Sequence, residues 1–334
     1  PEKEAPPTTP TTTEPVGLSP ATEENANPAP PDGSAAEPAA EAAEPTAGSA
    51  REKWRRFADA ARGLVDWNLF GDRVILRAYA QLQVDGTYAA GDDLIEAEIG
   101  ELESSIDLRM LTLYAEGTVD RHFKFVLGYD FGPDASLGNA FTEGIDRGLE
   151  VFGYRIGRFR TGIFQEPFSL ERMTSSCDNG FLERPLPVQT FAPGNNIGYM
   201  VYDSAAKERL SWAAGFFSFG SKNEQNASNS SLSVTLRLAG LPLWREDGRR
   251  YAHLGLAYST RDPQSSSTRF RSRPEARFVP FVADTGDIDS SKIQLFGAEA
   301  ALVNGPLWLQ SELIYSKVAT AEYGGLGFWG GYVQ

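Results

Sequence analysis

Residues 231–240 read SLSVTLRLAG, and this stretch determines the fold class. Its apolar positions are Leu232, Val234, Leu236 and Leu238. Between them stand Ser233, Thr235 and Arg237. Successive side chains of a β-strand point to opposite faces, so one face of this strand is apolar and the other is polar. The stretch therefore predicts a strand with an apolar side and a water-facing side, of the length that a tilted strand needs to cross a bilayer.

The same alternation continues along the chain from about Arg73, in twelve or thirteen segments separated by Gly, Asp, Asn and Pro turns. These segments lie near 73–85, 104–117, 121–131, 147–156, 158–166, 196–203, 209–219, 230–240, 250–260, 275–283, 291–303, 306–318 and 328–334. Aromatic residues gather near segment ends, as at Phe216 and Trp329, which is typical of interfacial girdles. The pattern predicts an all-β protein, a transmembrane antiparallel β-barrel of the outer membrane; a soluble β-domain is the alternative.

The first 50 residues have a different composition. They hold 11 of the 21 prolines, nine acidic residues, one lysine and no aromatic residue. Such a segment has too little apolar bulk to form a core, so 1–50 is predicted to be a disordered linker. Residues 51–66 place Trp54, Phe57 and Leu64 at helical spacing and predict a short amphipathic helix. The barrel domain is predicted at 67–334, and we expect that the chain lacks its original start, including a signal peptide.

Charge and composition exclude several function classes. The net charge is −14, and residues 51–334 carry 30 basic against 36 acidic side chains. Without a basic excess, nucleic acid is excluded as a partner. A single cysteine, Cys177, and two histidines give no zinc-binding pattern, and no catalytic or nucleotide-binding motif has its required context. No enzyme, no metal and no cofactor is predicted.

Several motifs carry a family resemblance. They are GIFQEPFSLE at 162–171, TSS at 174–176, FLERPLP at 181–187, FAPGNNIG at 191–198, GLPLW at 240–244, HLGLAYS at 253–259, RSRPEARFVPFVADTG at 271–286, GAEAALVNGPLWLQSEL at 297–313 and GFWGGYVQ at 327–334. In this order the chain resembles the phosphate-selective porin O and P family. The resemblance implies a 16-stranded, usually homotrimeric outer-membrane barrel that passes anions such as phosphate or polyphosphate. Because only about thirteen strands are present, we expect that C-terminal strands are missing beyond Gln334.

An anion pore needs cationic side chains on its water-facing wall, and arginine adds bidentate geometry for phosphate oxygens. Strand parity selects the candidates that point into the lumen. They are Arg77, Lys124, Arg158, Arg160, Arg237 and Lys292. Arg269, Arg271 and Arg273 form a basic cluster in a loop that could funnel anions or fold into the pore.

The motif-rich loop after residue 166 is interpreted mainly as structural. Glu171 and Glu183 could pair with Arg172 and Arg184 to hold this loop folded inward. The functional alternative is a loop that narrows the pore. Two other functions remain open for the whole protein: a general or sugar-permeable porin, and a barrel whose tail at 1–50 tethers the outer membrane to the cell wall.

Overall fold

The computed structural model describes residues 66–71, 73–88, 104–133, 135–151, 154–176, 178–219, 231–263, 266–273, 281–322 and 324–334. The predicted linker at 1–50 and the predicted helix at 51–66 lie outside these residues, except that Asp66 begins the first strand. Cys177 is also outside them.

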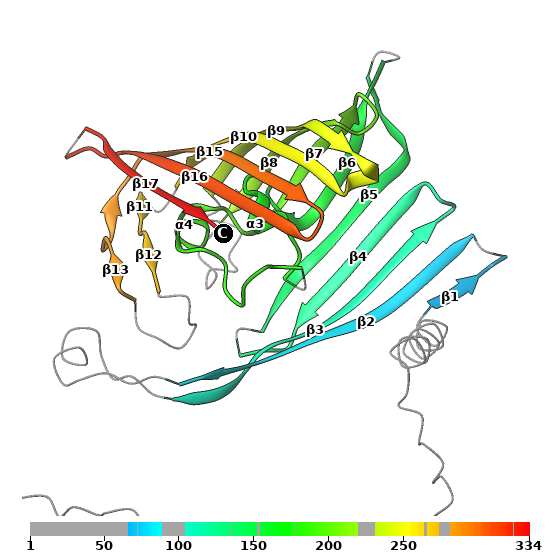
Figure 1. Ribbon diagram of the computed structural model, residues 1–334, viewed down its shortest axis with the longest axis horizontal. Coiled ribbons are helices and arrows are strands. Elements are labelled where there is room, and N and C mark those ends of the chain that lie inside the picture. Colours follow the sequence, from blue (N-terminus) through cyan, green and yellow to red (C-terminus); the bar gives the residue numbers. More distant parts are fainter. Residues whose placement is uncertain are drawn as a thin grey trace, which may run out of the picture. The chain divides into compact units, whose positions relative to one another are not determined.

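One antiparallel sheet of 13 strands dominates the described chain (Figure 1). Its strands are β1 (Asp66–Leu69), β2 (Val74–Thr87), β3 (Ser105–Val119), β4 (Phe123–Asp130), β5 (Ser136–Val151), β6 (Tyr154–Gln165), β7 (Asn195–Ala205), β8 (Leu210–Phe219), β9 (Ser231–Arg245), β10 (Arg250–Asp262), β15 (Lys292–Asn304), β16 (Leu307–Ala319) and β17 (Leu326–Val333). Each strand pairs with its neighbours in chain order. The predicted all-β antiparallel architecture is confirmed.

Two strand assignments differ from the sequence prediction. The segment predicted at 147–156 is the end of the longer β5, which turns into β6 near residue 152. Its first half, with Gly138, Asn139 and Gly144, has too little apolar bulk for the alternation to be visible. Most of the strand predicted at 275–283 lies outside the described residues; of its last three, Ala283 belongs to a two-residue strand outside the large sheet.

The smaller elements lie in three of the connections, those after β6, β9 and β10. They are α3 (Leu170–Met173), α4 (Leu186–Phe191), the 3-10 turn η2 (Glu246–Gly248), β11 (Ser267–Thr268), β12 (Arg271–Ser272), β13 (Ala283–Asp284) and β14 (Ile288–Asp289). Within the described ranges, no helix is both long enough and apolar enough to cross a membrane.

The connections alternate between short and long. Those after β1, β3, β5, β7, β9 and β15 have two to four residues, whereas those after β2, β6 and β10 are much longer. Because neighbouring strands are antiparallel, all short turns lie at one end of the sheet, which we call the turn end. Outer-membrane barrels have this asymmetry, with short periplasmic turns and longer extracellular loops.

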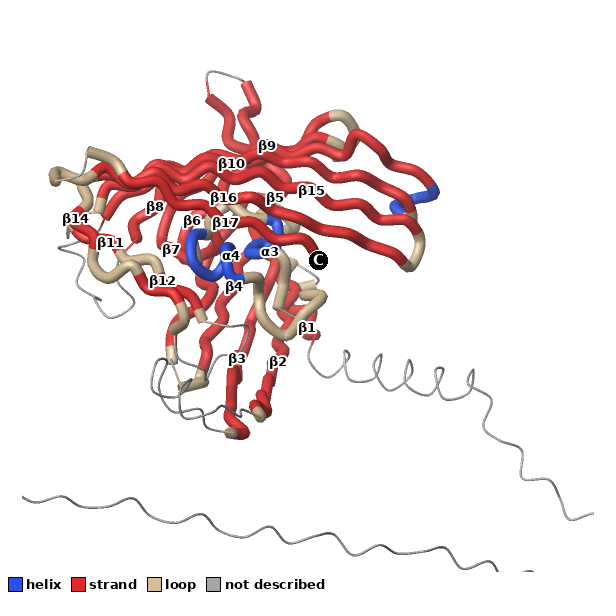
Figure 2. Tube along the Cα trace, turned by 60° about the vertical axis from the view of Figure 1, so that its left-hand side comes forward, coloured by secondary structure: helices blue, strands red, loops and turns tan. Residues whose placement is uncertain are grey.

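Residues 166–194, which we call the inserted segment, lie on the concave face of the sheet (Figures 1 and 2). Phe168 and Val188 of this segment are buried in one apolar cluster with Leu295 and Ile314 of the sheet. On the opposite side, Gln81 of β2 donates a hydrogen bond of 2.8 Å to Ser176 Oγ of the segment. The inserted segment therefore bridges distant strands, and we call the face that it contacts the inner face.

Burial along the strands is the reverse of that in a soluble protein. On the inner face, Thr235 and Ser259 are fully buried. On the outer face, Leu232 is 62% exposed and Leu256 is 65% exposed. A face of exposed leucines is what a strand presents to lipid, so the outer face is the membrane-contacting one.

This parity predicts opposite results for two adjacent positions in β2. Leu82 lies on the outer face and is 65% exposed, whereas Gln83 lies on the inner face beside Asp85. Leu82→Arg should lower the free energy of unfolding by about 2–4 kcal/mol because it puts a charge against hydrocarbon. Gln83→Arg should have little effect, because the new cation faces water and an acid. Urea titration of the barrel in vesicles measures both; equal losses would contradict the assignment of the faces.

Candidate functional site

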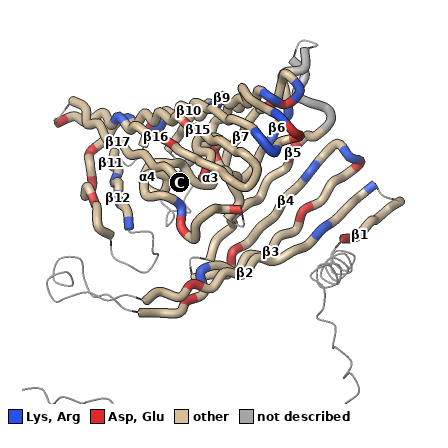
Figure 3. The backbone as a smooth tube through the Cα atoms, in the orientation of Figure 1, with Lys and Arg blue, Asp and Glu red and all other residues tan. Residues whose placement is uncertain are grey.

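Basic and acidic residues lie near one another along the strands (Figure 3), and several of the predicted anion-path residues pair with an acid. Arg77 Nε lies 2.8 Å from Asp66 Oδ1, and its Nη1 lies 3.4 Å from Glu116. Lys124 Nζ lies 3.2 Å from the same Glu116 carboxylate. These two cations are half-exposed on the inner face, and each is already paired.

Arg160 and Arg237 are held more tightly. Arg160 Nη2 lies 2.7 Å from Glu143 Oε2, and its guanidinium stacks 4.4 Å from the centre of the Phe141 ring. Arg237 forms an ion pair with Glu299, which also accepts a hydrogen bond of 2.8 Å from His253 Nε2. Both arginines lie on the inner face, but a passing anion would compete with a carboxylate at each.

Arg158 is different, because the structure gives it no ion pair within the described ranges. Its guanidinium carbon lies 5.7 Å above the centre of the Tyr202 ring. The residue pairs with Tyr202 across β6 and β7, two positions from Arg160 on the same face. A cation that rests on an aromatic face keeps its hydrogen-bond donors for an anion.

The inward placement predicted for Lys292 is wrong. Ile293 and Leu295 are the inward residues of β15, and both are buried in the apolar cluster beneath the inserted segment. Lys292 has the opposite parity, and its Nζ lies 3.8 Å from Asp262 at the loop end of the strand. Lys292 is the first residue of the strand, so no alternation precedes it from which its face could be predicted.

The three arginines of the loop cluster contact one acid, Asp284, and one aromatic ring, Phe281. Arg269 forms a two-point ion pair with Asp284, and this hydrogen bonding lowers the pKa of Asp284 to about 2. Arg271 and Arg273 lie 4.4 and 4.2 Å from the centre of the Phe281 ring. Phe270, which lies between Arg269 and Arg271 in the sequence, is buried against the inserted segment and the inner face of β15 and β16. The loop therefore folds toward the inner face.

Two further arginines lie in the inserted segment. The Nη2 of Arg172 approaches Gly194, where an added Cβ would lie 3.0 Å away, and its Nε is buried without a hydrogen bond. Arg184 donates from Nε to the Glu171 carbonyl and from Nη2 to the Thr174 carbonyl. Neither has a carboxylate within salt-bridge distance in the part of the chain that is described.

The acids that were expected to pair with these arginines have other partners. Glu171 accepts hydrogen bonds from Gln310 and Gln334 at 2.8 and 3.1 Å. Glu183 pairs with Arg109 of β3 at 2.6 Å. The predicted partners were wrong, although the segment is folded inward as expected. Adjacent residues on a helix point in different directions, and this signal could have excluded the pairing of Glu171 with Arg172.

Burial and neighbouring charges lower the pKa of both arginines. Burial, followed by the charge of Arg184, lowers the pKa of Arg172 to about 10. Burial also lowers the pKa of Arg184, against a smaller opposing effect of Glu171. An anion between the two guanidiniums would relieve both costs.

The described residues hold no group of three or more His, Cys, Asp and Glu side chains that could bind a metal ion. Most charges on the described part of the inner face are paired, whereas Arg158, Arg172 and Arg184 have no carboxylate within salt-bridge distance there.

A comparison with protein families agrees with this geometry. The family model for phosphate-selective porin O and P matches residues 81–334, which include most of the sheet and the whole inserted segment. A search of curated proteins gave no match. With an antiparallel sheet that is apolar outside and polar inside, the chain belongs to the phosphate-selective porin O and P family, whose members are channels of the bacterial outer membrane with transmembrane β-strands.

Proposed function

We propose that the protein is a passive channel for small anions, with phosphate or polyphosphate as solutes, and that Arg172 and Arg184 form its main anion-binding point. The observation that carries this proposal is the pair of partly buried arginines on the inserted segment, whose guanidiniums repel each other and lack a carboxylate within salt-bridge distance among the described residues. Arg158 extends the cationic wall on β6. Further positive charge comes from Arg77, Lys124, Arg160 and Arg237. The acid that pairs with each of them weakens its attraction for an anion.

The acids have a physical role in such a channel. Conduction requires that an anion bind strongly enough to leave water and weakly enough to leave the site. Glu143 and Glu299 each neutralise an arginine next to the path, so they limit how strongly anions are retained. A wall of unpaired arginines would trap phosphate rather than pass it.

Replacing both arginines of the inserted segment tests the proposal. In planar bilayers with a salt gradient, Arg172→Gln/Arg184→Gln should lower the chloride-over-potassium permeability ratio by about tenfold, because one hydrogen bond to a charged group contributes roughly 1.5–3 kcal/mol. Phosphate block of the chloride current should weaken in parallel. Arg73→Gln, which changes an exposed arginine paired with Asp120 at the turn end, serves as the matched control. An unchanged reversal potential in the double variant would reject the proposal.

The same experiment has a pH arm. A guanidinium is charged below its pKa, so anion preference should be complete at neutral pH and fall as the pH rises through about 10, where Arg172 loses its proton. The fall should be smaller in the double variant, where only the lysine side chains still lose charge in that interval.

A general or sugar-permeable porin is the second candidate, and one cavity favours it. A space of about 460 Å³ lies under α3 toward the turn end, lined by Tyr251, Trp308, Gln310, Glu171 and Asp178 among others. Aromatic faces beside amides and carboxylates are suited to neutral polyols. Equal permeability for chloride and potassium, together with current block by maltose or another neutral sugar, would favour this reading.

The homotrimer and the cell-wall contact of residues 1–50 stay predictions. A homotrimer would be seen in the mass of the detergent-solubilised protein. A cell-wall contact through residues 1–50 would be seen as wall co-sedimentation that is lost when these residues are deleted.

A further inference from the structure

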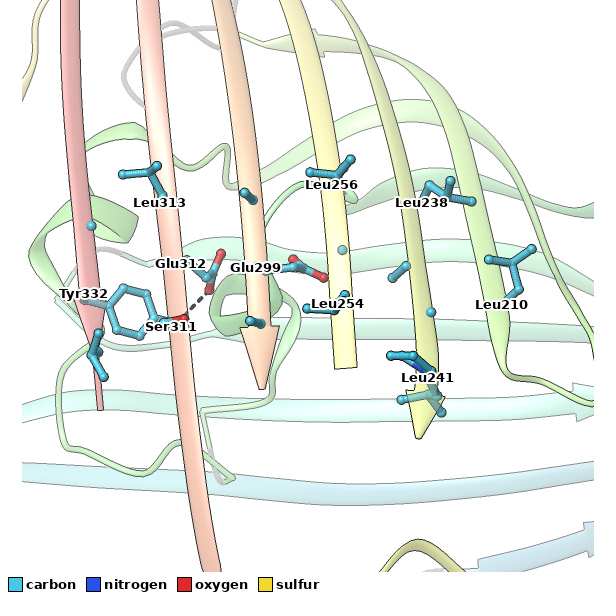
Figure 4. Close-up of a pocket in the computed structure, with 18 of the residues that line it drawn as sticks. Leu210, Leu238, Leu241, Leu254, Leu256, Glu299, Ser311, Glu312, Leu313 and Tyr332 are labelled. Carbon is cyan, nitrogen blue, oxygen red and sulfur yellow. Dashed lines mark hydrogen bonds between the residues drawn. The ribbon is translucent and has the colours of Figure 1, made fainter. Parts of the chain in front are cut away.

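The outer face carries a groove that the passage of anions does not use (Figure 4). It has a volume of about 1130 Å³ and runs across β8–β10 and β15–β17. Its sides are leucines that point outward, among them Leu238, Leu254, Leu256 and Leu313, which are about half to two-thirds exposed. The lining is therefore almost wholly apolar and faces the membrane.

The floor of the groove is made of small residues. Ala298 of β15 stands between Leu256 of β10 and Leu313 of β16 in the strand register. The acids that border the groove, Glu299 and Glu312, are already bonded on the inner face, to Arg237 and to Tyr332 respectively. A trough between rows of leucine, with a floor of alanine, has the apolar lining that an acyl chain needs.

The turn end of the groove is basic. Arg209 lines it, and the Arg209 carbonyl accepts a hydrogen bond of 2.8 Å from Leu241 N–H, which fixes the turn between β7 and β8 against β9. Lys207 lies in the same turn, and Arg245 and Arg249 flank the neighbouring turn between β9 and β10. Where the chain is described, none of these four side chains makes an ion pair, and the unpaired acids beside them are Glu208 and Asp247. The balance favours an anionic group at this end.

From this combination we infer that the groove binds an anionic phospholipid, with an acyl chain along Ala298 and the phosphate at Arg209. The turn end corresponds to the periplasmic side of an outer-membrane barrel, so the lipid belongs to the periplasmic leaflet. Basic side chains at a membrane surface attract anionic headgroups, and the apolar trough fixes one lipid in place rather than a diffuse layer. This site is separate from the anion path, which lies on the inner face.

Native mass spectrometry of the full chain in detergent tests the inference. After delipidation, the protein is mixed with phosphatidylglycerol or with phosphatidylcholine of the same acyl chains, and bound lipids are counted. The unchanged protein should retain phosphatidylglycerol preferentially. Arg209→Gln should reduce that retention by about fivefold, and Ala298→Phe, which fills the floor, should reduce retention of both lipids. Arg121→Gln, at an exposed turn arginine between β3 and β4, is the control and should leave both unchanged.

Several outcomes would overturn the site. One is phosphatidylglycerol retention in Arg209→Gln equal to that of the unchanged protein; another is an equal loss in Arg121→Gln, which would show non-specific attraction. Displacement of the lipid by millimolar inorganic phosphate would show a site for the free ion. A loss of oligomer mass in Ala298→Phe with lipid retention intact would show a contact between copies of the chain. Reversal potentials should be the same in all these variants, so failure here is distinguishable from failure of the proposed anion selectivity.

Discussion

Glu166→Ala is expected to lower the free energy of unfolding by about 3–5 kcal/mol, because it breaks a fully buried ion pair and leaves the other charge behind. Glu166 has no exposed surface. Arg261 Nη1 lies 3.1 and 3.0 Å from its two carboxylate oxygens. Thr235 and Asn196 each donate a further hydrogen bond of 2.6 Å. Without the carboxylate, the buried Arg261 guanidinium loses both of these contacts.

Urea titration in vesicles, followed by tryptophan fluorescence, measures this loss. Replacing both partners, as in Glu166→Gln/Arg261→Met, should restore much of the stability, because no buried charge remains unpaired. Asp66→Ala removes an acid from the exposed pair with Arg77 and should change stability by at most about 1 kcal/mol. If Glu166→Ala cost no more than Asp66→Ala, the buried pair would not anchor the inserted segment.

The sequence predicts the sheet well because lipid imposes a simple rule on each strand. Leu232, Val234 and Leu236 had to share one face, and the same alternation fixes most of the other strands. The rule fails where side chains are small, as in the first half of β5. This failure does not concern the order of the strands, which follows from short turns between antiparallel neighbours.

The pairing of charges could not be predicted from the sequence in the same way. Parity placed Arg160 and Arg237 on the inner face, but their acids, Glu143 and Glu299, come from other strands whose register the sequence does not give. The partners of the charged residues in the inserted segment are even harder to predict from the sequence. Arg172 and Arg184 stand next to glutamates in the sequence, and only the folded segment turns those glutamates toward Gln310 and Arg109.

Replacing Phe168 should change both the stability of the barrel and the conduction of anions. Its side chain is 1% exposed, packs with Val188 and Ile314, and lies so close to Gly297 that an added Cβ there would be 3.3 Å from the ring. Phe168→Ala should therefore lower the free energy of unfolding by about 3–5 kcal/mol, from lost apolar burial and the cavity that remains. The same change releases the apolar hold on the segment that carries Arg172.

If the inserted segment is loosened, the single-channel current should change in a way that the loss of positive charge alone does not produce. The single-channel current of Phe168→Ala should fluctuate between levels as the segment moves in the lumen, and anion preference should fall because Arg172 and Arg184 no longer keep one position. Arg172→Gln/Arg184→Gln should instead give a steady current with reduced preference. Phe181→Ala is the control, since that ring lies in the same segment but is 56% exposed, and its loss should change stability by no more than about 0.5 kcal/mol. A Phe168→Ala channel with a steady current and unchanged stability would show that polar contacts such as Glu166–Arg261 hold the segment without help from the apolar cluster.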